Sequence, residues 1–206
     1  YYCLSWKGFQ LNYGLQTPAQ HSGRTGTQSA AWPTTGGGLM HKLWDRYWWD
    51  ASSTVDIKSA LCDNPDVKTT DDYNATPLHH ALVYGTYQHV ELLLSAGADV
   101  TARNDSGSTP LHRAAQLSTP QIIDILLKAG ADVMARTNSG ETPLHYASWY
   151  PTFEGVRYGS IEALLAAGAD PKEKDNDGKT SWDYAQQNKT IKDTKSYWAL
   201  HHVMFN

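Results

Sequence analysis

A six-residue motif that recurs every 33 residues constrains the fold of this chain more than any other feature. The three copies share the pattern T-P-L-H-x-A and lie at residues 76–81, 109–114 and 142–147. A Gly-Ala-Asp triplet follows each copy, at residues 97–99, 130–132 and 168–170, and the third triplet comes five residues later than the period predicts. A fixed period near 33 residues indicates a stack of similar supersecondary units.

Each part of the motif suits a unit of two helices. Thr109 can cap a helix N-terminus, and Pro110 then occupies the first helical position, where its missing N–H costs nothing. The apolar residues at 122–127 give one face of a second helix, and Gly130 suits a left-handed C-cap. The polar tract at 132–141 is turn-like. One such unit cannot bury its own apolar face, so neighbouring units must stack.

These blocks resemble the ankyrin-repeat family. The resemblance rests on the three T-P-L-H-x-A blocks, the three Gly-Ala-Asp blocks and the Leu-Leu pairs before them, and it covers residues 71–185. It implies an all-α repeat solenoid, an ankyrin-repeat stack of about five repeats with atypical ends and an extended N-terminal arm. In this family the motif histidine is a hydrogen-bonding strut between neighbours, a role that would fall here to His79, His112 and His145.

The expected organisation is an N-terminal arm over residues 1–42 and an ankyrin-repeat domain over residues 43–206. The arm is aromatic and rich in Gly, Ser and Thr, and we expect it to pack on the stack through Trp6 and Trp32. The five repeats are expected at about 43–70, 71–103, 104–136, 137–174 and 175–206.

The terminal repeats depart from the motif, as the ends of a stack usually do. The first is expected to be degenerate, with short helices at 39–50 and 54–62. The fourth carries an insertion at 149–155 between its helices. In the fifth, Ser-Trp-Asp at 181–183 replaces Pro-Leu-His, which is typical of a C-terminal cap, and a last helix is expected within 191–205.

Composition and charge exclude several classes of function. The formal net charge of −4 gives no support to nucleic-acid binding, and no run of 18 apolar residues predicts membrane insertion. No signal peptide is visible, but the chain begins at Tyr1 without a methionine, so we expect that something upstream is missing. Export and a cytoplasmic location both stay open, and the sequence predicts no oligomeric state.

The only two cysteines, Cys3 and Cys62, do not make a disulfide scaffold. Two free thiols are one interpretation. The other is a single bridge that ties the N-terminal arm to the first repeat, because Cys62 aligns with the expected exposed positions Ser95 and Lys128.

No motif predicts catalysis, a cofactor or a metal site. His21 and His41, with Asp45 and Asp50, could be parts of a hydrolytic site in the N-terminal segment, but no nucleophile elbow or other signature accompanies them. Residues 173–178 resemble the start of a calcium loop, yet the twelfth position, which needs a bidentate glutamate, is Tyr184.

We therefore expect a non-enzymatic module that binds another protein, through a concave face made of hairpin tips and first helices. Repeat register selects the candidate partner-binding residues, which are Asp72, Tyr73, Val83, Tyr84, Asp105, Ser106, Ser108, Gln116, Leu117, Asn138, Ser139, Glu141, Trp149, Tyr150, Asn176 and Asp177, with Lys179 beside them. Aromatic side chains dominate interface energetics, and the acidic rim favours a partner with a basic surface.

Three uses of such a module stay open. It could inhibit or neutralise its partner, it could deliver a small catalytic or ligand-binding appendage formed by the N-terminal segment, or it could be a scaffold that links two proteins. For Trp149 and Tyr150, packing of the insertion onto the stack is the alternative to a role in binding.

Overall fold

The computed structural model describes residue 58 and residues 67–117, 119–149 and 159–205. The chain divides into two units, Tyr1–Gly36 and Gly37–Asn206, and every described residue belongs to the second unit. Several expectations fall outside the described residues: the N-terminal arm, the helix at 39–50, the helix at 54–62 apart from residue 58, Cys3, Cys62, His21, His41, Asp45 and Tyr150.

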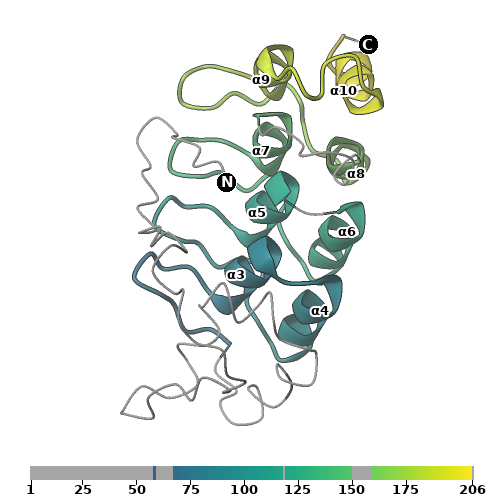
Figure 1. Cartoon of the computed structure of the whole chain (residues 1–206). Coiled ribbons are helices and arrows are strands. Elements are labelled where there is room, and N and C mark those ends of the chain that lie inside the picture. Colours follow the sequence, from purple (N-terminus) through teal and green to yellow (C-terminus); the bar gives the residue numbers. More distant parts are fainter. Residues whose placement is uncertain (1–57, 59–66, 118, 150–158, 206) are drawn as a thin grey trace, which may run out of the picture. The chain divides into compact units, whose positions relative to one another are not determined.

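The described residues form helices in two rows (Figure 1). The first helix of each pair lies in one row, which comprises α3 (Pro77–Tyr84), α5 (Pro110–Leu117), α7 (Pro143–Trp149) and α9 (Ser181–Gln187). The second row comprises α4 (Tyr87–Ser95), α6 (Pro120–Lys128), α8 (Ser160–Ala166) and α10 (Lys195–Phe205). Helices pack against their neighbours within each row and across the rows. The predicted all-α repeat solenoid is confirmed.

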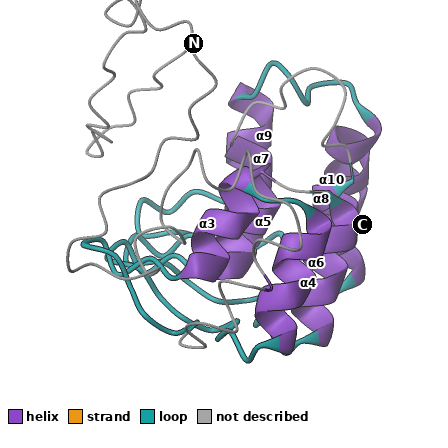
Figure 2. Cartoon of the chain, turned by 60° about the horizontal axis from the view of Figure 1, so that its bottom comes forward, coloured by secondary structure: helices purple, strands orange, loops and turns teal. Residues whose placement is uncertain are grey.

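The loops between successive helix pairs project from the first row on the side away from the second row (Figures 1 and 2). They correspond to the polar, turn-like tracts of the sequence, and each tip is a turn. The only bridge between extended residues in the described part of the chain joins Lys174 to Thr180, at the base of the last loop. We call these loops hairpins.

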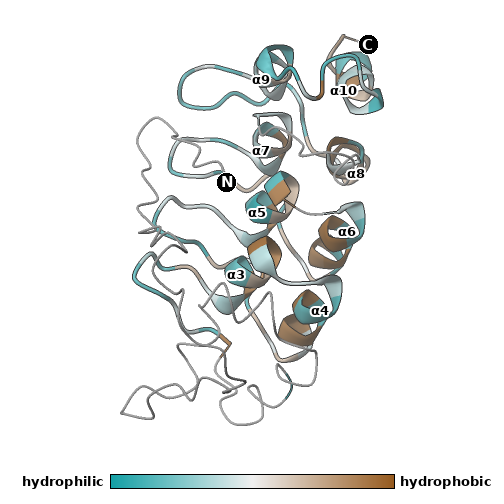
Figure 3. Ribbon diagram, viewed as in Figure 1, coloured by the Kyte–Doolittle hydropathy of each residue, from teal (hydrophilic) through white to brown (hydrophobic). Residues whose placement is uncertain are grey.

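The hydrophobic core lies between the two rows and repeats with the sequence period. Leu78, Leu111 and Leu144 of the first helices are fully buried. Their counterparts on the second helices are also fully buried, and these are Leu93, Leu126 and Leu164. Figure 3 shows apolar residues on the helices of both rows, while the hairpins are largely hydrophilic. Each repeat thus buries its apolar face against its neighbours, as a stack requires.

The motif determines where each first helix begins. Helices α3, α5 and α7 begin at the motif prolines, Pro77, Pro110 and Pro143, as the sequence predicts. The residue before each proline is the motif threonine, and Thr76 has the extended backbone (φ −84°, ψ 165°) of an N-cap position.

The motif histidines connect neighbouring repeats, which confirms their role as struts. In the first described repeat, the Thr76 backbone N–H donates to His79 Nδ1 over 3.2 Å. The neutral ring therefore carries its proton on Nε2, which donates to the Ser108 carbonyl of the next repeat over 3.2 Å. His112 bonds to the Glu141 carbonyl and His145 to the Lys179 carbonyl in the same way, each over 3.1 Å.

Asp183 ends this series in the last repeat. Its carboxylate occupies the position of the motif histidine and accepts both the backbone N–H and the hydroxyl of Thr180, over 2.8 and 2.7 Å. An ionised carboxylate has no proton to donate to a further carbonyl. The neighbouring Trp182 is buried and contacts α10, so this repeat is finished by a helix rather than by another motif.

Candidate protein-binding surface

The hairpin tips form one continuous edge. Backbone hydrogen bonds of 2.9–3.0 Å connect each tip to the one before it, from Asp105 to Tyr73, from Asn138 to Ser106 and from Asn176 to Ser139. Side-chain amides add to this edge, because Asn138 Nδ2 donates to the Asp105 carbonyl over 2.8 Å and Asn176 Nδ2 donates to the Asn138 carbonyl over 3.0 Å. The tips are therefore fixed relative to one another.

The first residue of most hairpins also holds the shape of its own turn. Asp71 Oδ1 accepts the backbone N–H groups of Tyr73 and Ala75, each over 2.8 Å. Asp175 Oδ1 accepts those of Asp177 and Lys179, each over 2.9 Å. A turn held in this way by an Asx side chain is ordered before a partner arrives, which lowers the entropic cost of binding.

The tips expose most of the residues that the sequence assigns to binding. The exposed residues are Asp72, Tyr73, Asp105, Asn138, Ser139, Asn176 and Asp177, while Ser106 is half-buried. Tyr73 is the aromatic residue among them, and 49% of its surface is accessible.

The first helices contribute partly buried apolar residues and one exposed tryptophan. Val83, Tyr84, Gln116 and Leu117 are half-buried, and Tyr84 also packs against the core. Trp149 is 36% exposed, and its ring meets the ring of Tyr184 edge to face at a centroid distance of 4.9 Å. Trp149 thus packs on the next repeat and stays accessible at the same time.

The Asn188 side chain fixes the end of α7 beneath Trp149. Its amide donates to the Ser148 carbonyl over 2.9 Å and to the Trp149 carbonyl over 3.3 Å. A cleft of about 360 Å³ lies beside this contact, lined by Trp149 and residues 187–190.

Two predicted binding residues are buried, which corrects the expectation that they are exposed. Ser108 is 1% exposed and Glu141 is 8% exposed. The reason is the bond that each backbone carbonyl accepts from the motif histidine of the preceding repeat, since this bond holds both residues in the seam between repeats. Neither side chain belongs to the binding surface.

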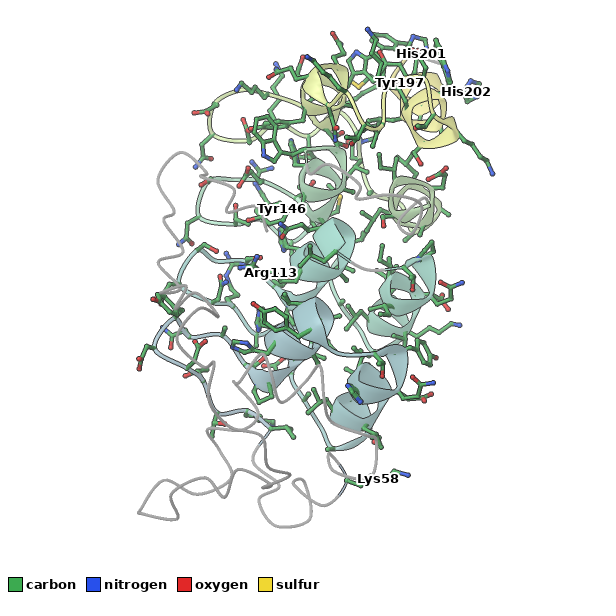
Figure 4. All side chains as sticks on the ribbon, in the orientation of Figure 1. Lys58, Arg113, Tyr146, Tyr197, His201 and His202 are labelled. Carbon is green, nitrogen blue, oxygen red and sulfur yellow. The ribbon has the colours of Figure 1, made fainter. Side chains whose placement is uncertain are left out.

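The sequence interpretation did not consider the variable residue that lies between the motif histidine and the motif alanine, although this residue makes contacts of its own. His80 Nε2 lies 2.9 Å from Asp71 Oδ2, and the Tyr146 ring meets His112 edge to face at 5.1 Å. Tyr184, the corresponding residue of the last repeat, bonds to Asp175 through its hydroxyl. Arg113 and Tyr146 lie on the hairpin side of the first row (Figure 4). The residue type at this position varies between the repeats while the rest of the motif is constant, and this variation could have pointed to the position from the sequence.

Comparison with known protein families decides which family the chain belongs to. The description "Ankyrin repeats (3 copies)" matches residues 102–175, and "Ankyrin repeats (many copies)" matches residues 60–114. Together the two matches span more than half of the 206 residues. The chain belongs to the ankyrin-repeat family. No curated protein matches it. Ankyrin repeats are in general protein-binding modules and typically not enzymes, and this general role extends to the chain.

Two arginines beside the ankyrin hairpins are engaged by the next repeat. Arg103 donates to the Arg136 carbonyl over 2.6 Å, and Arg136 donates to the Lys174 carbonyl over 2.6 Å. Arg136 also forms an ion pair of 2.7 Å with Glu173. The exposed carboxylates of the tips, on Asp72, Asp105 and Asp177, have no such ion pair among the described residues.

Negative charge also concentrates inside the last two ankyrin repeats. Burial raises the pKa of the Glu141 carboxyl, and the neighbouring charges of Asp175 and Asp177 raise it further. Burial likewise raises the pKa of the Tyr184 hydroxyl, together with its hydrogen bond to Asp175. The buried Glu141 carboxyl therefore lies close to two further carboxylates in these repeats.

Two kinds of feature are absent from the described part of the stack. It contains no group of three or more His, Cys, Asp or Glu side chains that could hold a metal ion. None of its helices is long and apolar enough to cross a membrane.

Proposed function

We propose that this ankyrin-repeat protein binds another protein through the hairpin–helix surface. We define this surface by its exposed tips, Asp72, Tyr73, Asp105, Asn138, Ser139, Asn176 and Asp177, and by Trp149. The observation that carries the proposal is the combination of two accessible aromatic side chains with a set of tips that hydrogen bonds hold in place. Aromatic residues on an ordered surface are the usual hot spots of protein interfaces.

The partner that suits this surface has a basic patch. The exposed carboxylates of the tips would attract such a partner and increase its rate of association, whereas Tyr73 and Trp149 would supply most of the binding free energy. A protein that covers a functional basic patch in this way inhibits it, and inhibition of the partner is the use that we propose.

Capture from the native source tests the proposal, with a double variant in which both aromatic residues are replaced. Tyr73→Ala with Trp149→Ala should weaken binding of a captured protein by at least about 30-fold, because truncation of one hot-spot residue costs about 2 kcal/mol or more. The matched control is Tyr87→Ala, which removes a 39% exposed aromatic residue of α4 in the second row. This control should bind like the wild type.

Circular dichroism and urea unfolding establish that the variants are folded before binding is compared. Equal capture by the wild type and the folded double variant would contradict the proposal. Tyr84 is kept in this design because it packs against the core, so that its removal would change stability as well as binding.

A further inference from the structure

The last helix, α10, has two different sides. Its inner side is attached to the stack, since Leu200 is fully buried and the Ser196 hydroxyl donates to Glu162 of α8 over 2.8 Å. Tyr197 packs on Trp182 of α9 at a centroid distance of 4.7 Å. These contacts fix the position and rotation of α10, so its other side has a defined composition.

That other side carries Lys195, Trp198, His202 and Phe205, all of which are exposed. Trp198 is 53% exposed and Phe205 is 59% exposed, more than any other large hydrophobic residue in the described part of the chain. The spacing of three, four and three residues aligns the four side chains in one stripe along the helix. This is the spacing by which one helix packs along another. We call these four residues the α10 stripe.

The aromatic rings on this side of α10 are in contact with neighbouring rings. His201 lies between the two exposed rings, with centroid distances of 5.7 Å to Trp198 and 4.8 Å to Phe205. The Trp182 ring of α9 meets the Phe205 ring edge to face, at a centroid distance of 5.7 Å. Figure 4 shows Tyr197, His201 and His202 at this end of the stack. Rings that are ordered in advance lose little conformational entropy on binding.

We propose that the α10 stripe binds the α10 stripe of a second copy, in an antiparallel contact with two-fold symmetry. The stripe is complementary to itself in this orientation, because its residues are placed symmetrically about position 200. Lys195 meets Phe205 of the second copy, and Trp198 meets its His202. These are a cation–aromatic pair and an aromatic pair, and each occurs twice across the two-fold axis.

The charges of the stripe decide against a parallel contact. A parallel pair would place Lys195 against its own copy. In the antiparallel pair the two Lys195 residues lie about 15 Å apart along the axis, at a rise of about 1.5 Å per residue, which is beyond the Debye length of about 8 Å at physiological salt. A contact centred on one helix is smaller than an obligate interface, so we expect monomer and dimer to exchange with concentration.

Sedimentation equilibrium of the full chain tests the proposal. The average mass of the wild type should rise from the monomer value of 22.8 kDa toward twice that value as concentration increases. Trp198→Ala with Phe205→Ala should remain monomeric over the same range. The matched control, Tyr87→Ala, should dimerise like the wild type, and so should the variant of Tyr73 and Trp149, which separates this contact from the proposed function.

A wild-type chain that stays monomeric up to about 1 mM would overturn the proposal, whichever other segment, partner or lipid surface then covers the stripe. Dimerisation that is unchanged in the folded Trp198/Phe205 variant would overturn it as well.

Disulfide trapping tests the orientation, in a chain whose two native cysteines are replaced by serine. Chains with Lys195→Cys and chains with Phe205→Cys should form a mixed disulfide when combined, because these positions face each other in the antiparallel pair. Lys195→Cys alone should not cross-link, since disulfides require Cα atoms within about 7 Å. Efficient cross-linking of Lys195→Cys to itself would show a parallel contact and overturn the proposed geometry.

Discussion

The motif histidines show how one side chain can determine both a helix start and a contact between repeats. His112 accepts the backbone N–H of Thr109 through Nδ1 over 3.2 Å and donates from Nε2 to the Glu141 carbonyl. Nδ1 can accept only in the neutral ring, so protonation breaks the bond from Thr109. Burial lowers the pKa of His112 to about 4, and burial lowers the pKa of His79 to about 4 as well.

The stack should therefore lose stability in mild acid. An unfolded histidine, with a pKa near 6.5, binds a proton more readily than the folded one between pH 6.5 and pH 4. The stabilisation is fully present above pH 6.5 and decreases as pH falls, by about 3 kcal/mol at pH 4 for each such histidine. The raised pKa of Glu141 acts in the opposite direction. Urea unfolding at a series of pH values measures the combined effect of these groups on the free energy of unfolding.

A pair of variants assigns this effect to the struts. His112→Gln should reduce the pH dependence of the unfolding free energy by the share of one buried histidine. Gln88→Ala, at an exposed position of α4 whose side chain carries no titratable group, should leave that dependence as it is in the wild type. If both variants keep the wild-type dependence, the struts are not the acid-sensitive groups.

At the scale of elements, the hairpins are packed as closely as the helices. Gly107 has a φ of 73°, and a Cβ there would lie 2.5 Å from Asn138 Oδ1 and 2.8 Å from the Asn138 backbone nitrogen of the next hairpin. Gly130 has a φ of 97° but nothing within 4 Å of its Cβ position. Both positions would strain the backbone of a residue other than glycine, but only position 107 lies against the next hairpin. A comparison of the two positions therefore distinguishes backbone strain from contact between hairpins.

Alanine substitutions at these glycines should differ in cost. Gly130→Ala should destabilise the stack by about 1–2 kcal/mol, the cost of a left-handed L residue. Gly107→Ala should cost about 1–3 kcal/mol more, because the next hairpin has to move. Chemical unfolding of both variants measures the difference. Equal losses would mean that the hairpin edge is looser than the structure shows.

The sequence was sufficient to predict the helix starts and the order of the helix pairs, because both depend on a motif with a local physical role. The resemblance to the ankyrin-repeat family implied the histidine struts. It was not sufficient to predict which residues of a repeat are exposed. Ser108 and Glu141 have polar side chains at turn positions, yet the carbonyls that they present to the preceding histidine hold them in the seam. The half-burial of Tyr84 likewise depends on packing that no local pattern encodes.

The sequence was also not sufficient to predict which residues of α10 are exposed. The sequence predicted a last helix within residues 191–205, and Leu200 of that helix packs on the stack. Trp198, Val203 and Phe205 are exposed, although the Phe205 ring also meets Trp182, because the rotation of the helix is set by Trp182 and Glu162 of other elements.

In the described part of the stack, several kinds of contact recur from one repeat to the next. The buried leucines, the histidine struts and the backbone bonds between hairpin tips each connect a repeat only to its neighbours. A stack built in this way presents a long surface whose residues keep fixed positions. The two faces that we assign to binding are separate, since one consists of hairpin tips and Trp149 and the other of the α10 stripe.

Hydrogen exchange of the chain with and without its captured partner shows whether the hairpin tips form the binding surface. We predict that the partner slows exchange at the tips, residues 72–74, 105–106, 138–139 and 176–177, and at the end of α7. Exchange in α4 and α6 of the second row should be unchanged. Protection confined to α4 and α6, with the tips exchanging as in the free chain, would contradict the assignment of the binding surface.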